Sequence, residues 1–218
     1  MDKLCANETF WDVTQSWQAE QPVFSKCFQN LVLTCLPCLT LWAMATMYLP
    51  CVVRRTTSLA GKRGWMFWAK QLSGSMMLIL GVISIFLVIS HMMESRDGDT
   101  PIAQLIAPCA RTATMMLVLV VVTMETAKGI NSSVVLFIFW LLVVIGDIVQ
   151  LYCVILQQFQ DTSDNLVAAA MFYLTFALDL LQLSLHSFSD KSVTISQDKT
   201  PENSSSLPAW LTYCWTNR

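Results

Sequence analysis

Three ionisable residues, Arg111, Asp147 and Asp179, fall within long apolar segments of the sequence. A charged side chain at the centre of a membrane-spanning helix costs about 2.5–3.5 kcal/mol on insertion scales, so each should find a partner in protein or water. Arg111 and Asp147 lie at the same depth, about 13 Å from the outer ends of two successive predicted helices at 1.5 Å per residue. Because a short loop joins these helices, we expect antiparallel neighbours and predict an Arg111–Asp147 ion pair.

Asp179 belongs to a polar stripe on the last apolar segment. With Thr175, Gln182 and His186 it follows an i, i+4, i+7, i+11 pattern, which places all four side chains on one helix face. Such a stripe can line a substrate or proton path, or it can hydrogen-bond between helices at about 0.6 kcal/mol per contact. We favour the second role. His186 and His91 lie near opposite ends of their helices, and no set of ligand types has metal spacing, so we predict no metal, cofactor or catalytic residue.

The elements that must position these groups are apolar helices. Hydrophobic residues make up 55% of the 218 residues and charged residues 13%, against about 25% charged in soluble domains. Crossing the hydrocarbon layer requires about 20 apolar residues. The sequence therefore predicts an all-α integral membrane bundle of five transmembrane helices, at Phe28–Val53, Leu72–Met93, Ile102–Met124, Val134–Leu156 and Leu166–Phe188.

Lysines and arginines are distributed unequally between the two sides of this predicted bundle. Nine fall on the side of the first loop and the C-terminus, Lys70 among them, and three fall on the other side. The positive-inside rule then puts the N-terminus outside and the C-terminus in the cytoplasm. Asn7 begins an N-x-T glycosylation acceptor on the outer side. The N-terminus lacks the features of a cleavable signal peptide, and a net charge of −2 gives no reason to expect a nucleic-acid partner.

Cys5 and Cys27 are the only two of the eight cysteines on the predicted outer side, where thiols are oxidised. A disulfide between them closes a loop of about 22 residues and stabilises the fold by about 3 kcal/mol. The alternative is two free thiols. We predict the disulfide.

After the last apolar segment, the sequence becomes mainly polar. We divide it into an extracellular tail (1–27), a five-helix transmembrane domain (28–188) and a cytoplasmic linker (189–218). Apolar residues near the end of the linker recur with the spacing of an amphipathic helix, which lies on a membrane surface or against a partner. These residues are Leu207, Trp210, Leu211, Cys214 and Trp215.

Several short strings resemble the N-terminal membrane domain of the multidrug-resistance-associated proteins, subfamily C of the ATP-binding-cassette exporters. They run in order along nearly the whole chain. The strings are Phe10-Trp11-Asp12, Lys26-Cys27-Phe28-Gln29-Asn30, Pro37-Cys38, Leu41-Trp42, Pro108, Glu125, Lys128-Gly129, Ser132-Ser133, Phe139-Trp140, Phe188-Ser189-Asp190-Lys191-Ser192 and Pro201-Glu202 with the serines up to Ser206.

The resemblance implies an accessory five-helix domain that serves targeting, membrane retention and protein–protein contact in an exporter of organic anions and conjugates. It also implies glycosylation at Asn7 and pairing of Cys5 with Cys27. Its expected partners are the lipid bilayer and an ABC transporter core or another membrane protein. The expected location is the plasma membrane, with a vacuolar or other endomembrane as the alternative. No role for Arg111 or Asp147 is taken from the resemblance.

Two other functions are compatible with the sequence. One is a free-standing multispan membrane protein that scaffolds or regulates a transporter or channel. The other is a small transporter in its own right, which the lack of an evident inverted repeat disfavours. No G-x-x-x-x-G-K-[ST] phosphate-binding loop occurs, so we expect no ATPase activity from this chain.

Overall fold

A computed structural model describes residue 5 and residues 24–54, 64–94, 102–128, 133–160 and 166–187. Every element in these ranges is helical, and five helices are long and apolar enough to cross a membrane, which confirms the predicted fold class. The elements are a short α2 (Lys26–Phe28), a π-helical segment η2 (Gln29–Thr34), α3 (Cys35–Arg54), α4 (Trp65–Glu94), α5 (Ala103–Ala127), α6 (Val134–Gln160) and α7 (Leu166–Ser187).

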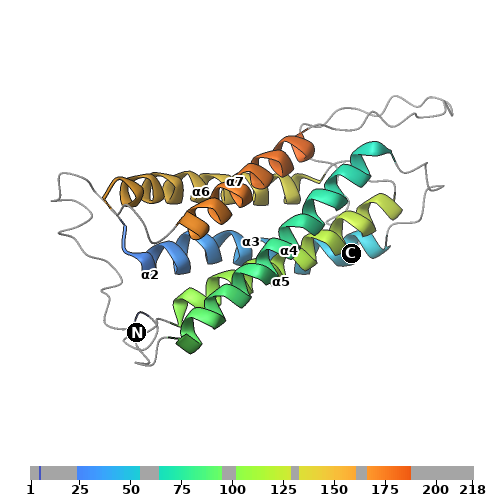
Figure 1. The fold of residues 1–218 in the computed structure, drawn as a ribbon. Coiled ribbons are helices and arrows are strands. Elements are labelled where there is room, and N and C mark those ends of the chain that lie inside the picture. The colour runs from blue at the N-terminus through green and yellow to red at the C-terminus, as the bar shows by residue number, and fades with distance from the viewer. Residues whose placement is uncertain are drawn as a thin grey trace, which may run out of the picture.

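The five long helices form a closed ring in the order α3, α5, α4, α7, α6. Figure 1 shows α3, in blue, lying between α6, in yellow, and α5, in light green. The expectation that the third and fourth spans are close neighbours was therefore wrong, because α5 and α6 are not among the extensively packed pairs. Burial explains the arrangement: α3 inserts Leu41 and Tyr48 into the same core as Val118 of α5 and Phe139 of α6.

The bundle carries apolar side chains on its outside as well as in its core. Large side chains such as Met47, Phe86 and Leu39 are mostly exposed, while Leu136 and Trp140 are fully buried. A surface of this kind is suited to lipid, since hydrocarbon chains are as apolar as the side chains that meet them. Specific packing inside the ring must then come from shape and from polar contacts.

The second span begins earlier than predicted. Helix α4 starts at Trp65 rather than Leu72, and the amide of Phe67 donates to the carbonyl of Gly64 in its first turn. The residues from Trp65 to Gln71 include neither proline nor glycine, which is compatible with this earlier start. Lys70 therefore lies within a helix and is only 8% exposed, although the sequence placed it in a cytoplasmic loop.

The first span contains a local widening of the helix, and a side chain of α6 donates hydrogen bonds to it. Pro37 has no amide hydrogen, so the carbonyl of Leu33 loses its α-helical partner, and η2 ends just before this point. Backbone carbonyls freed within hydrocarbon need new donors. Gln150 of α6 donates to this π-helical segment, although not to Leu33: its Nε2 donates to the Thr34 hydroxyl at 3.1 Å and to the Gln29 carbonyl at 3.5 Å.

Gly146 allows α6 to lie directly against this segment. A β-carbon added at Gly146 would lie 3.0 Å from the backbone oxygen of Leu33, which cannot move aside as a flexible side chain can. We expect Gly146→Val to lower the free energy of unfolding by about 1–3 kcal/mol through overpacking. Unfolding in mixed micelles, followed by circular dichroism, measures the loss. The control is Ala170→Val on the exposed face of α7; equal stability of both variants would contradict the close approach.

Candidate polar sites within the membrane domain

Arg111, Asp147 and Asp179 meet inside the ring. Nη2 of Arg111, on α5, lies 3.5 Å from Oδ2 of Asp147, on α6, and donates a hydrogen bond to Oδ2 of Asp179, on α7. Asp147 is 5% exposed and Asp179 is fully buried. These three residues, here called the ionic triad, therefore connect three helices of which only α6 and α7 pack extensively against each other.

The structure adds Asp179 to the pair predicted from the sequence. Depth counted along each helix put Asp179 about 6 Å below the other two residues. That count ignores helix tilt and the length of the arginine side chain, which together bring the guanidinium of Arg111 to both carboxylates. The guanidinium of Arg111 bridges the two carboxylates, so a single side chain links α5 to α6 and to α7.

A cavity of about 300 Å³ reaches the triad from the predicted outer half of the bundle. Arg111 lines it and its side chain is 23% exposed, so the triad is not completely enclosed. The remaining lining is mostly apolar and comes from η2, α4, α5 and α7. Its polar members besides Arg111 are Thr34, Ser84, Thr112 and Thr175.

The side chains of the polar stripe predicted on the last helix contact different neighbours in the structure. Asp179 contacts Arg111, whereas Gln182 donates from Nε2 to the Lys70 carbonyl of α4 at 3.1 Å. His186 stacks on Trp140 of α6 with ring centroids 6.2 Å apart. Thr175 donates only to carbonyls of the preceding turn of its own helix. The stripe thus joins α7 to three different helices rather than forming one network.

A second buried polar group lies toward the predicted cytoplasmic end. The Tyr48 hydroxyl of α3 donates to Oε1 of Glu125 on α5 at 2.7 Å, and Lys70 is close enough to Glu125 and His186 to interact electrostatically with both. The sequence pattern did not predict that Tyr48, Lys70 and Glu125 form a buried polar cluster. Glu125 was missed because the predicted span ended one residue before it, at Met124.

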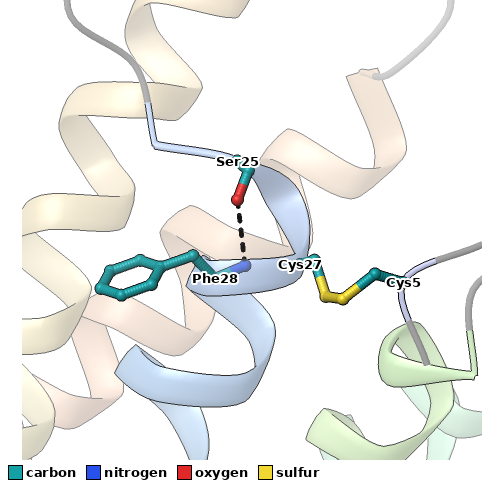
Figure 2. The surroundings of a disulfide bond; sticks show 4 residues. All are labelled: Cys5, Ser25, Cys27 and Phe28. Atoms are coloured by element: carbon teal, nitrogen blue, oxygen red, sulfur yellow. Dashed lines mark hydrogen bonds between the residues drawn. A yellow bond between two sulfur atoms is a disulfide. The ribbon is translucent and has the colours of Figure 1, made fainter. Parts of the chain in front are cut away.

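A disulfide joins Cys5 to Cys27, with Cα atoms 5.6 Å apart (Figure 2). Both cysteines are buried and pack with Leu31 and with Ala103, the first residue of α5. In the same turn the Ser25 hydroxyl accepts a hydrogen bond from the Phe28 amide at 3.3 Å, as Figure 2 also shows. The disulfide fastens the N-terminal tail to the start of the first span, beside the start of α5.

Other predicted sites lie outside the described residues and stay predictions: the glycosylation site Asn7 and the linker helix with Leu207, Trp210, Leu211 and Trp215. The division of the chain into 1–27, 28–188 and 189–218 likewise stays a prediction. In the ranges that the structure describes, no three His, Cys, Asp or Glu side chains gather as metal ligands would.

A ring of five apolar helices with polar contacts buried inside it defines a polytopic membrane domain. Residues 2–168 match the family model of the ABC transporter TMD0 domain, and the chain belongs to this family.

Three relatives align with essentially the whole chain. ATP-binding cassette sub-family C member 2 of Rattus norvegicus is 28% identical over 220 residues, which cover 100% of this chain and 14% of the relative. Member 3 of Mus musculus is 28% identical over 228 residues, covering 100% of this chain and 15% of the relative. Member 3 of Homo sapiens is 26% identical over 230 residues, covering 99% and 14%. The chain therefore spans only 14–15% of the length of these relatives, in their N-terminal part.

Removal of the single cation of the triad should strongly destabilise the membrane domain. We expect Arg111→Met to lower the free energy of unfolding by roughly 3–5 kcal/mol, because it leaves buried carboxyl groups without their cation. Unfolding of the purified chain in mixed micelles measures this loss. The matched control is the triple variant Arg111→Met, Asp147→Asn, Asp179→Asn, which should recover most of it. An Arg111→Met variant as stable as the wild type would contradict an energetic role for the triad.

The disulfide should contribute independently of the triad. We expect Cys27→Ser to lower the free energy of unfolding by about 3 kcal/mol, as the closure of a loop of this length predicts. Reduction of the wild type should produce at least this loss, because Cys51 is disulfide-bonded as well. Cys109→Ala is the control, since Cys109 is a free and exposed cysteine. Reduction should lower the free energy of unfolding of Cys109→Ala and of the wild type more than that of Cys27→Ser. An equal loss in all three would mean that the Cys5–Cys27 disulfide is not the cause.

Proposed function

We propose that this chain is the accessory N-terminal membrane domain of a multidrug-resistance-associated-type ABC exporter of organic anions and conjugates. Its role is targeting, retention in the membrane and contact with other membrane proteins. The observation that carries this proposal is the match to the TMD0 domain family together with alignment to the N-terminal part of sub-family C members 2 and 3.

The interior of the bundle supports a structural role rather than a transport path. Arg111 is held between two carboxylates, and Tyr48 is held against Glu125, so the polar groups join helices to one another. Contacts of this kind favour one packed arrangement of the ring. A fixed ring is a suitable body for docking, whereas alternating access requires parts that rock against each other.

The proposal places the chain in the plasma membrane with its N-terminus outside. Two observations support this orientation. Arg54 is the last residue of α3 and Lys128 follows the last residue of α5, at the ends that the positive-inside rule assigns to the cytoplasm. The Cys5–Cys27 disulfide fits the oxidising side of the membrane.

Co-expression tests the proposal. A tagged form of this chain is produced in cells with sub-family C member 2 of Rattus norvegicus from which the aligned N-terminal segment has been removed. We expect the chain to co-purify with that core and to raise the fraction of it at the cell surface. An unrelated five-span membrane protein serves as the control.

Failure to co-purify, with an unchanged surface fraction, would contradict the accessory role. If the purified chain alone instead moved organic anions across liposome membranes, the hypothesis that the chain is itself a small transporter would replace the accessory role. Arg111→Met, Asp147→Asn, Asp179→Asn should retain docking if the triad acts only inside the bundle.

A further inference from the structure

The ionic triad has one positive and two negative side chains. A net negative charge within hydrocarbon is costly, because neither water nor a distant ion can balance it there. In the described part of the chain, the other basic side chains with described positions are Arg54, Lys70 and Lys128, toward the predicted cytoplasmic ends, and the imidazoles of His91 and His186. The triad needs a further positive charge from another source.

Among the residues that the structure describes, the surroundings of the triad supply no such charge. On α3 the nearest titratable side chain is Cys38, a free thiol beside Arg111. On α4, Lys70 lies with Glu125 and His186 instead, and the side chains that face Arg111 across the cavity are uncharged. On α7, His186 lies about two helical turns from Asp179 and stacks on Trp140.

The two carboxyl groups also face one another. Oδ2 of Asp147 and Oδ2 of Asp179 both lie against the same Nη2 of Arg111, so the two carboxyl groups are close neighbours. In addition, Oδ2 of Asp147 and Oδ1 of Asp179 are buried and have no hydrogen-bond partner. Two ionised carboxylates in this position repel each other, whereas one proton between them makes a hydrogen bond and removes the excess charge.

We propose that Asp147 and Asp179 form a proton-binding site that holds one shared proton at neutral pH, with Arg111 as the counter-ion of the remaining carboxylate. The triad is then electrically neutral as a whole. The proton joins α6 to α7 while the guanidinium joins both to α5. This site belongs to the pair, so neither aspartate holds the proton without the other.

The cavity borders the site at Arg111. Arg111 lines that cavity and remains partly exposed, so water that enters it comes into contact with the triad. Removal of the proton in alkaline solution restores the repulsion between the two carboxylates. Packing of α6 against α7 thereby becomes dependent on the proton concentration.

Infrared spectroscopy tests the proposal on the purified full chain in lipid nanodiscs. Aspartate labelled with carbon-13 in the side-chain carboxyl separates aspartate bands from that of the buried Glu125. We expect one protonated aspartate carboxyl per chain at neutral pH, and its loss in alkaline solution. The band should vanish in Asp147→Asn and equally in Asp179→Asn, because the remaining aspartate then pairs with Arg111 as a carboxylate. Glu125→Gln is the control and should retain it.

Three results would overturn the shared proton. The first is a wild type without the protonated band. The second is a band that survives Asp147→Asn, which would mean that Asp179 holds a proton alone, and the third is the converse result for Asp179→Asn. Circular dichroism checks that each variant folds, and the band intensity of the unaltered wild type tests the proposal without any substitution. None of these results depends on whether the chain docks to a transporter core.

Discussion

Hydrocarbon solvates no polar group, so each polar group inside this bundle depends on another polar group of the same chain. The ionic triad is the strongest case. Arg111 cannot remain in its position without the carboxylates of α6 and α7, and those carboxylates are equally costly without Arg111. Since α5 and α6 share little direct packing, the triad supplies a connection across the ring that apolar contacts do not.

The same constraint organises the less charged parts of the interior. Pro37 interrupts the hydrogen bonding of the first span, and Gln150 donates to a carbonyl and a hydroxyl of the π-helical segment that precedes it. Gln182 reaches the backbone of α4, and Tyr48 reaches Glu125. Each of these side chains links a different pair of helices, so the polar contacts specify which helices become neighbours. Lipid-facing residues provide no comparable specificity, because any apolar side chain is compatible with lipid.

Sequence reasoning succeeded where the physics is local. Apolar length alone located all five spans, and the fourth has the predicted bounds Val134–Leu156. Local reasoning failed where tertiary packing decides. The order of helices around the ring places α3 between α5 and α6, which short loops do not reveal. Counting depth along single helices identified Asp147 as a partner of Arg111 but not Asp179, since helix tilt is a property of the whole bundle. Glu125 and Lys70 were missed because charges near the predicted ends were assumed to lie in water.

The unequal lengths of the helices have a consequence for the membrane around the domain. The 30 residues of α4 extend about 45 Å, whereas a typical hydrocarbon layer is about 30 Å thick. Such a helix must lean or let its ends enter the headgroup region, where Trp65 and Trp68 are suited to lie. A thinner bilayer requires a larger helix tilt, and a thicker bilayer requires a smaller one. Hydrophobic mismatch thus lets bilayer thickness favour some compartments over others for this domain, before any protein partner binds.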